Sequence, residues 1–209
     1  MPQRTLVATM GTDDRQVLPA MRLMPYDWLV LVAAPEAFES AGFRRLEAIE
    51  PLLHRVPVDP YDFLSCLEAV RLAVREASRD GPARMSVGGG SKILSCAAIL
   101  AAFQEGVEAW YCDPEPIRLP VLRGIRLVEA FAREEQTLGR LVRGPVALDR
   151  LVRSAARHGL SRSLATRAVR SLTAKGLLDM QVVEGTTVVR PTAVFPALRP
   201  HLRGPPGKA

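Results

Sequence analysis

Gly88–Lys92, a stretch of sequence Gly-Gly-Gly-Ser-Lys, follows a short β-type run at residues 84–87 and precedes a helix of small residues at 93–104. Three consecutive glycines let the backbone turn sharply and bring bare N–H groups against a ligand. The N-terminus of the following helix adds aligned donors and a partial positive charge, which suit an anion such as phosphate. Lys92 is the only lysine among the first 127 residues and adds a full charge. This strand–glycine–helix order predicts a phosphate-binding loop.

Strands and helices alternate on both sides of this loop. Beside 84–87, the β-type runs lie at residues 5–9, 28–33, 54–58, 107–111 and 116–122, and the other helices at 12–24, 35–50 and 60–79. Such alternation implies right-handed βαβ units and a doubly wound, Rossmann-like parallel sheet. In these sheets ligands bind beyond the carboxyl ends of the strands. Gly11 and Thr12, which follow the first strand, are therefore expected to line the same pocket as Gly88–Lys92.

The chain lacks the patterns of several common sites. The loop after the first strand, Gly11–Asp13 (the first loop), has one glycine, which excludes a G-x-G-x-x-G fingerprint. In the second loop, Ser91 precedes Lys92 where a Walker loop needs Gly-Lys-Ser/Thr. No Ser/His/Asp or Cys/His set is visible, and Asp13 and Asp14 suit a helix start better than an acid–base pair. Three scattered histidines predict no metal site, and three cysteines without CxxC spacing indicate free thiols in a reducing cytosol.

Charge divides the chain into two parts. Residues 1–127 hold 14 basic and 16 acidic residues, a net of −2, whereas residues 128–209 hold 14 and 6, a net of +8. A near-neutral half joined to a basic half favours a nucleic-acid or membrane partner for the latter. No apolar run is long enough to span a membrane, and the basic half lacks an amphipathic helix with aromatic anchors. We therefore expect a cytoplasmic protein that binds nucleic acid and not a membrane.

The basic half has the element order of a winged helix-turn-helix. Helices are expected at 127–142, 148–156 and, capped by Ser161, from there to about residue 175. A turn containing Gly159 joins the last two, as in a helix-turn-helix. Two strands joined at Glu184–Gly185 then form a hairpin in the position of a wing. A short helix at 193–198 and a proline-rich tail expected to be disordered, 199–209, end the chain.

The third of these helices divides into two faces. Ala165, Ala168 and Leu172 belong to a narrow apolar arc, while three arginines and two hydroxyl residues occupy another. No acidic residue occurs from 150 to 175, so this face suits the major groove of double-stranded DNA better than a merely solvated role. The predicted DNA-binding residues of this turn and helix, with the phosphate contacts of the preceding helix, are Arg150, Arg153, Arg157, Ser161, Arg162, Ser163, Thr166, Arg167 and Arg170.

Four segments together resemble a known family. The run 85–98, Met-Ser-Val-Gly-Gly-Gly-Ser-Lys-Ile-Leu-Ser-Cys-Ala-Ala, is similar to the "V-T-G-G-T-K-x-M" loop and helix of CRISPR-associated Rossmann-fold (CARF) domains. Further matches are Thr9–Asp13, Val56–Phe63 and Leu119–Leu122. With the winged helix, the chain looks like the CARF-type transcriptional regulators of archaeal CRISPR–Cas antiviral systems. The resemblance implies a CARF domain at 1–126 and a winged helix at 127–198.

The resemblance also implies a ligand and an assembly. It implies a homodimer that binds one cyclic oligoadenylate, often the tetramer, across its two-fold axis, with no cofactor. Two departures from the family pattern matter: Gly88 stands where Thr or Ser is usual, and Ser91 where Thr is usual. Carried over by position, the ligand contacts are Gly11, Thr12, Asp13, Gly89, Gly90, Ser91 and Lys92.

Three functions fit these features. The leading hypothesis is a ligand-responsive DNA-binding regulator. A second is a metal-independent ring nuclease in which Ser91 and Lys92 stabilise the transition state, although no general base is visible. A third is a repressor that senses another anionic metabolite. The operator, the sign of regulation, the ring size and the coupling of ligand to DNA are not encoded in any pattern of the sequence.

Overall fold

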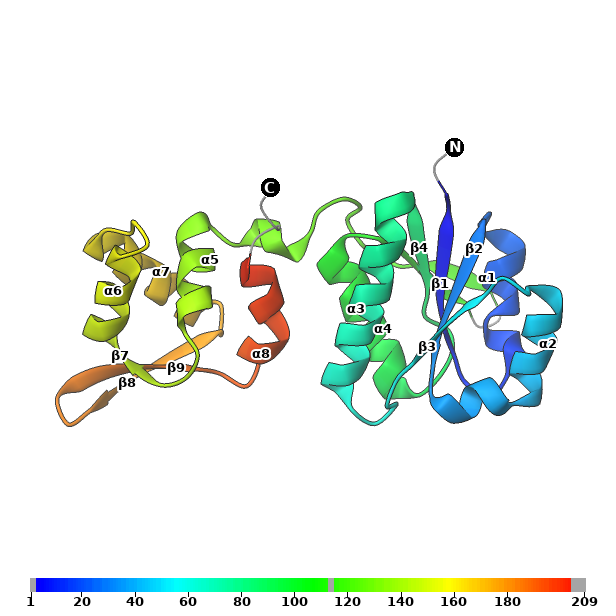
Figure 1. The fold of residues 1–209 in the computed structure, drawn as a ribbon, viewed down its shortest axis with the longest axis horizontal. Helices are drawn as coiled ribbons and strands as arrows, with labels where there is room; N and C mark the ends of the chain where they lie inside the picture. Colours follow the sequence, from blue (N-terminus) through cyan, green and yellow to red (C-terminus); the bar gives the residue numbers. More distant parts are fainter. Residues whose placement is uncertain (1–2, 113–114, 204–209) are drawn as a thin grey trace. The chain divides into compact units, whose positions relative to one another are not determined.

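The computed structural model describes residues 3–112 and 115–203 (Figure 1). The chain divides into two compact units, Met1–Arg126 and Leu127–Ala209. Within the described ranges, no helix combines the length and apolar character that a membrane crossing requires.

The first unit is built on a six-stranded sheet of order β3-β2-β1-β4-β5-β6. The strands are β1 (Thr5–Met10), β2 (Trp28–Ala33), β3 (His54–Pro57), β4 (Ala83–Ser86), β5 (Glu108–Cys112) and β6 (Pro116–Arg118). The first five run parallel, which confirms the predicted α/β fold with a parallel sheet. The sixth strand is antiparallel because only three residues separate it from β5, too few for a crossover.

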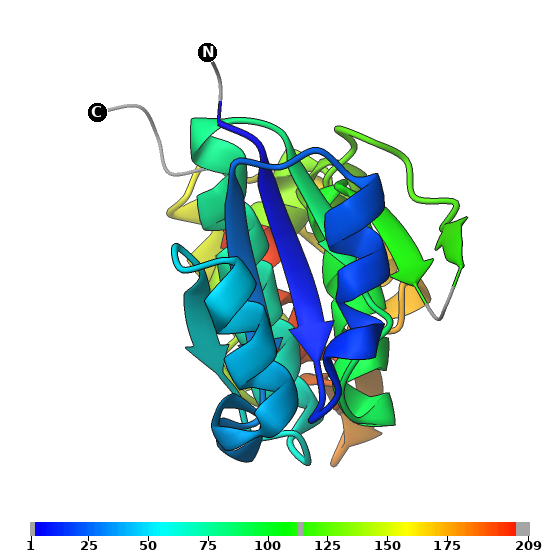
Figure 2. The same ribbon diagram turned by 90° about the vertical axis from the view of Figure 1, so that its right-hand side faces the viewer.

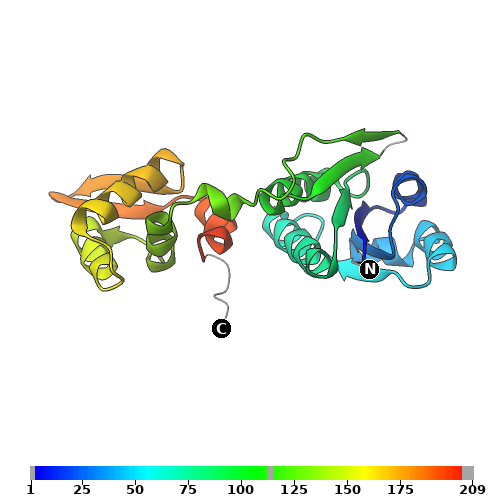
Figure 3. The same cartoon turned by 90° about the horizontal axis from the view of Figure 1, so that it is seen from above.

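Helices cover both faces of this sheet (Figures 2 and 3). They are α1 (Leu18–Leu23), α2 (Ala41–Ile49), α3 (Phe63–Asp80) and α4 (Lys92–Glu105). One face carries α1 and α2, and the other carries the closely packed pair α3 and α4. All six residues of β1 are buried between these layers, as expected for the central strand of a doubly wound sheet.

Three predicted helices begin later than the sequence suggests. The segment after β1 forms a 3-10 turn, Asp14–Gln16, before α1, and Pro35–Glu39 forms another before Ser40 caps α2. The α3 helix begins at Phe63 because Asp62, not Asp59, accepts hydrogen bonds from the free backbone N–H groups of its first turn. Residues 59–62 therefore form a loop that leads into α3.

The described part of the second unit contains three helices of nine or more residues, a short fourth helix and a small sheet (Figure 1). Its elements are α5 (Arg133–Leu141), β7 (Val146–Ala147), α6 (Leu148–Ala156), α7 (Arg162–Ala174), β8 (Leu178–Val183), β9 (Thr186–Pro191) and α8 (Phe195–Leu198). The sheet is antiparallel, in the order β7-β9-β8. Side chains from all three helices and from the hairpin meet in one apolar core around Leu138, Leu151 and Leu172.

The predicted helix over residues 127–142 is interrupted. A 3-10 turn, Leu127–Ala130, precedes α5, and the Glu135 carboxylate accepts a hydrogen bond from the Ala132 N–H at 2.7 Å. This contact caps the first turn of α5 and ends the preceding segment.

The prediction of a disordered tail from residue 199 is wrong for residues 199–203. They form a 3-10 helix in which Leu202 is fully buried against α5, at a point where Gly139 leaves space for it. The rest of that predicted tail, 204–209, lies outside the described residues. The high proline content of the tail suggested disorder. The contact that orders residues 199–203 is with α5, more than 50 residues earlier in the chain, and the composition of the tail carries no information about it.

Replacing Gly139 by Ala tests this packing. A methyl group there would lie 2.5 Å from Leu202 Cδ1 and 2.9 Å from its Cβ, so we expect Gly139→Ala to lower the free energy of unfolding of the second unit. The loss should be roughly 1–2 kcal/mol after the gain in helix propensity is subtracted. Urea denaturation followed by circular dichroism measures it.

Two references make this measurement specific. Gly144→Ala, in open space in the same unit, should be close to neutral. Both tryptophans, Trp28 and Trp110, belong to the first unit, so their fluorescence should report an unchanged transition. Equal stability of the two alanine variants would show that Leu202 does not depend on Gly139.

Candidate functional site

The glycine loop, which follows β4, packs its backbone directly against the backbones at the ends of β5 and β1. A Cβ atom at Gly88 would collide with the carbonyl oxygen of Cys112, and one at Gly89 with that of Thr9. The sequence suggested that these glycines clear space for a ligand, but they clear space for the ends of β5 and β1. The absence of a side-chain hydroxyl at position 88 follows directly, because no side chain fits there.

The first loop and the glycine loop lie side by side. A Cβ atom on Gly11 would be 3.4 Å from the Gly90 backbone nitrogen. Gly90 has φ +89°, a conformation that favours glycine, and this turn directs the chain into α4. Gly89 donates its N–H to the Thr9 hydroxyl at 3.3 Å. The structure thus brings together the two predicted loops at the carboxyl edge of the sheet.

Ser91 is the N-cap of α4, and its hydroxyl both accepts and donates a hydrogen bond. Its oxygen accepts a hydrogen bond from the Leu94 N–H at 3.0 Å, and its proton is donated to the Pro60 carbonyl at 3.0 Å. A hydroxyl used in this way positions the helix and the loop 59–62. Donation of this proton to a phosphate would require Ser91 to give up its bond to the Pro60 carbonyl.

Lys92 is the first residue of α4 and is exposed. Among the described residues its ammonium group has no carboxylate partner within ion-pair distance. A free ammonium group beside the N-terminus of a 14-residue helix adds to the positive potential there. Lys92 is the one cation among the predicted ligand contacts and is therefore the side chain expected to pair with an incoming anion.

The two aspartates after β1 have separate structural roles. Asp13 is exposed and caps the 3-10 turn by accepting the Arg15 N–H at 3.0 Å. Asp14 is buried and accepts two hydrogen bonds from the Arg45 guanidinium, at 2.5 and 3.0 Å. These hydrogen bonds hold the pKa of Asp14 below its ordinary value, against the opposing effect of burial. The carboxylate of Asp14 ties the first loop to α2, while Thr12 stays exposed above it.

A third segment, Asp59–Asp62, reaches this edge, and sequence reasoning placed it in a helix instead. The hydrogen bond from Ser91 to the Pro60 carbonyl joins it directly to the glycine loop. The signal that could have placed it is the second aspartate: Asp62 competes with Asp59 as helix cap and leaves Pro60 and Tyr61 in the loop.

The exposed face of α7 carries three arginines, Arg162, Arg167 and Arg170. Its five predicted DNA-binding residues line one shallow, open hollow: Arg162, Ser163, Thr166, Arg167 and Arg170. The opposite side of the helix, with Ala165 and Leu172, is buried in the core. One ion pair, a 3.3 Å contact to Asp149 with both side chains largely exposed, involves Arg162. Arg167 and Arg170 have no ion pair within the described ranges.

The remaining predicted DNA contacts lie outside this hollow. Ser161 caps α7 by accepting the Leu164 N–H and lies 3.1 Å from the Ser163 hydroxyl. Inside the hollow, the Thr166 hydroxyl donates to the Arg162 carbonyl of the same helix. Exposed arginines on α6 and at its end complete the predicted set: Arg150, Arg153 and Arg157.

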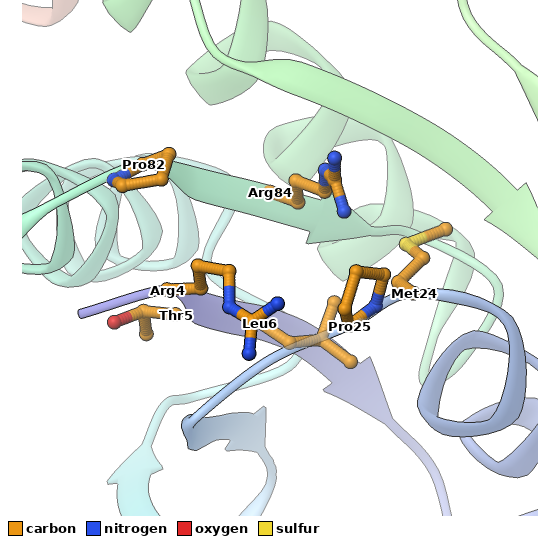
Figure 4. Close-up of a pocket in the computed structure, with 7 residues that line it drawn as sticks. All are labelled: Arg4, Thr5, Leu6, Met24, Pro25, Pro82 and Arg84. Atoms are coloured by element: carbon orange, nitrogen blue, oxygen red, sulfur yellow. The ribbon is translucent and has the colours of Figure 1, made fainter. Parts of the chain in front are cut away.

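The first unit has a small hollow at the amino-terminal edge of its sheet, opposite the glycine loop, and this hollow is not a comparable anion site. It lies at the amino-terminal ends of β1 and β4, where Arg4 and Arg84 border it (Figure 4). Arg4 is paired with Asp27 at 2.8 Å, and Arg84 lies 3.7 Å from Glu108, which Arg123 also contacts, so each of the two bordering cations already has a carboxylate neighbour. Within the described ranges, no three His, Cys, Asp or Glu side chains are placed to hold a metal ion.

No protein-family profile and no curated protein sequence matches this chain. Solved structures resemble it at low identity. Can2 from Sulfobacillus thermosulfidooxidans, in complex with cyclic tetra-adenylate, aligns with 97% of this chain and 62% of its own, at 15% identity and a TM-score of 0.49. VC1899 from Vibrio cholerae aligns with 96% of this chain and 64% of its own, at 10% identity and 0.44.

Csm6 from Enterococcus italicus, bound to cyclic hexa-2′-fluoro-hexa-dAMP, aligns with 84% of this chain and 56% of its own, at 10% identity and a TM-score of 0.48. The chain thus spans less than two thirds of the length of each of these proteins. At such identities and TM-scores, the function has to be argued from the residues of this chain.

The Asp14–Arg45 pair predicts a specific pH dependence. Because the folded-state pKa of Asp14 is depressed, the pair stabilises the first unit above the pKa of an unfolded carboxyl, and this stability is lost as the pH falls through the folded pKa. Asp14→Asn should therefore lower the free energy of unfolding by about 1–2 kcal/mol at neutral pH. Tryptophan fluorescence in urea, at neutral pH and in acid, measures it.

In acid the difference between Asp14→Asn and the wild type should shrink, because the wild-type carboxyl is then also neutral. Glu39→Gln removes an exposed carboxylate from the same unit and should change little at either pH. A deficit for Asp14→Asn that is the same size at both pH values would contradict the ionic role.

Proposed function

We propose that this protein is a ligand-responsive, DNA-binding regulator, in which the first unit senses a cyclic oligoadenylate and the second binds double-stranded DNA. The observation that carries the proposal is the exposed face of α7, where three arginines surround one open hollow and two of them lack an ion pair among the described residues. Cations concentrated on one face, with Asp149 beside Arg162 alone, suit a phosphate backbone and guanine edges.

The second unit is proposed to be a winged helix-turn-helix. Its order of α5, β7, α6, α7, β8 and β9 supports this assignment, with α7 as recognition helix and the β8–β9 hairpin as wing. Gly159, at φ +81°, forms the turn between α6 and α7. The arginines of α6 would contact phosphates and position the unit without reading bases.

The proposed ligand is an anionic ring, most simply cyclic tetra-adenylate. The first loop, the glycine loop and Lys92, whose ammonium group has no ion-pair partner among the described residues, lie together at the carboxyl edge of a parallel sheet. This edge is where doubly wound sheets bind ligands, and a helix N-terminus with a lysine favours phosphate.

A homodimer is proposed from the composition of α4. Residues 96–103 of this helix are all apolar, so it has no polar face to turn to water, yet Leu100 and Phe103 are 44% and 45% exposed. A helix that is apolar on every side is normally covered. Pairing of two copies along α4 would bury this face and bring two Lys92 side chains towards one symmetric polyanion. Sedimentation as a monomer at tens of micromolar would contradict the pairing.

Lys92 favours a second candidate function, metal-independent cleavage of the ring. Its ammonium group could stabilise negative charge that develops on a phosphate during attack by a neighbouring ribose hydroxyl. The occupied hydroxyl of Ser91 supports a positioning role for that residue instead. Linear products after incubation of ligand with protein would establish cleavage, and an intact ring would exclude it.

Substitution of Lys92 tests the ligand site. Lys92→Ala should weaken binding of cyclic tetra-adenylate about 10- to 100-fold, because a charge-assisted contact is lost. Isothermal titration calorimetry across ring sizes measures both the affinity and the preferred ring. Arg22→Ala is the control. It removes one positive charge from the last turn of α1, away from the proposed site, and should bind like the wild type.

Tight binding that survives Lys92→Ala unchanged would remove this residue from the site. Failure of every cyclic oligoadenylate to bind the wild type at micromolar concentration would instead favour the third candidate, a repressor that senses a different anionic metabolite.

Arg167→Ala tests the DNA face. An operator is first selected from random duplexes with the wild-type protein, and affinity is then measured by fluorescence anisotropy at fixed salt. Because a guanidinium fork contributes to base discrimination, the variant should lose about 10- to 100-fold on the operator and much less on random duplex.

Arg133→Ala, an exposed arginine in the first turn of α5, is the matched control for net charge. It should lower affinity for the operator and for random duplex by the same small factor. Equal losses on both duplexes with Arg167→Ala would make that arginine a phosphate contact only.

A further inference from the structure

Tyr61 is the most exposed large apolar side chain in the described part of the chain, at 83% exposure. It contributes nothing to the core, and an aromatic ring left in water forgoes the stabilisation that burial would supply. The hydrogen bonds described for this residue involve its backbone. The ring is therefore available for a partner outside the fold.

The backbone that carries this ring is held firmly. The Tyr61 N–H is bonded to the Asp59 carboxylate at 2.9 Å, and the Asp59 carbonyl accepts from the Asp62 N–H at 3.3 Å and the Cys66 thiol at 3.1 Å. Asp62 in turn caps α3. An exposed aromatic side chain on a fixed loop loses little conformational entropy on binding, which favours a recognition role.

The loop 59–62, which carries Tyr61, is joined by a hydrogen bond to the end of the glycine loop. Ser91 donates its hydroxyl proton to the carbonyl of Pro60, the residue directly before Tyr61. Tyr61 therefore directly follows the residue that is hydrogen-bonded to Ser91, and Lys92 directly follows Ser91. A cationic helix start and an exposed aromatic side chain thus belong to two segments that a hydrogen bond joins.

The charges of the loop decide which part of a ligand it can take. Asp59 and Asp62 flank Tyr61 with exposed carboxylates, which would repel a phosphate. A nucleobase is uncharged and planar and stacks on an aromatic ring whatever its hydrogen-bonding pattern. The loop 59–62 therefore suits the base of a nucleotide, while its phosphate lies at the glycine loop.

We propose that Tyr61 is a base-stacking residue of the ligand site, in contact with one adenine of the cyclic oligonucleotide. This inference rests on the proposed function of the first unit and assigns a residue outside the two loops predicted from sequence. It divides recognition between Lys92, which contacts phosphate, and Tyr61, which contacts the base.

Calorimetric titration with cyclic tetra-adenylate tests this role in four variants of the full chain. Tyr61→Ala should weaken binding about 10- to 100-fold, the range expected for loss of one stacked base. Tyr61→Phe should bind like the wild type, because the ring is kept. Tyr61→Leu, which keeps apolar area without the ring, should fall between them. Leu52→Ala removes a comparably exposed apolar side chain from the turn before β3, at the opposite edge, and should have no effect.

Each outcome distinguishes the two hypotheses. Wild-type binding that is unchanged in Tyr61→Ala would overturn the stacking role and leave the proposed function in place. Lack of wild-type binding would contradict the proposed ligand and the inference with it. Sedimentation velocity supplies a second readout: weaker dimerisation of Tyr61→Ala, with unchanged affinity per dimer, would make Tyr61 an interface residue and overturn the inference.

Discussion

The loop after β4 can cross the ends of β5 and β1 only because its first two residues have no side chains. That backbone approach determines where α4 starts, and the start of α4 determines where Ser91 can act as its cap. The cap then holds the loop 59–62 through the Pro60 carbonyl. Three segments that are distant in sequence are thus positioned by one steric constraint, and the proposed ligand site depends on it.

A polar contact has a similar role in the second unit. Lys175, directly after α7, donates to the Glu135 carboxylate at 2.7 Å and to the Ala130 carbonyl at 2.9 Å, and lies 5.0 Å from the centre of the Phe131 ring. Burial raises the pKa of Glu135, but hydrogen bonds led by that of Lys175 outweigh it and hold the pKa below its ordinary value. The end of the proposed recognition helix is therefore fastened to the segment that enters this unit.

The two units use different physical means to favour anions. In the first, the proposed site relies on the start of α4 and on one lysine, Lys92. In the second, several arginines share one exposed face whose opposite side is buried. Short-range geometry suits a small ligand, whereas distributed charge suits a long polyanion.

Patterns local to the chain were sufficient for much of this structure. The alternation of apolar runs and helices determined the parallel sheet, and the spacing of alanine, leucine and arginine along residues 161–175 determined which side of α7 is buried. Both depend on periodicity, which is a property of neighbouring residues.

Other features were decided only by contacts between distant segments. The choice of Asp62 over Asp59 as helix cap, the engagement of the Ser91 hydroxyl by Pro60, and the burial of Leu202 beside Gly139 each depend on a partner that no local pattern specifies. Sequence alone therefore determined the order of most helices and strands and the arginine face of α7. Tertiary structure decided which glycines serve packing, which hydroxyl is occupied and which aromatic side chain is left exposed, because these outcomes depend on how closely separate backbones approach one another.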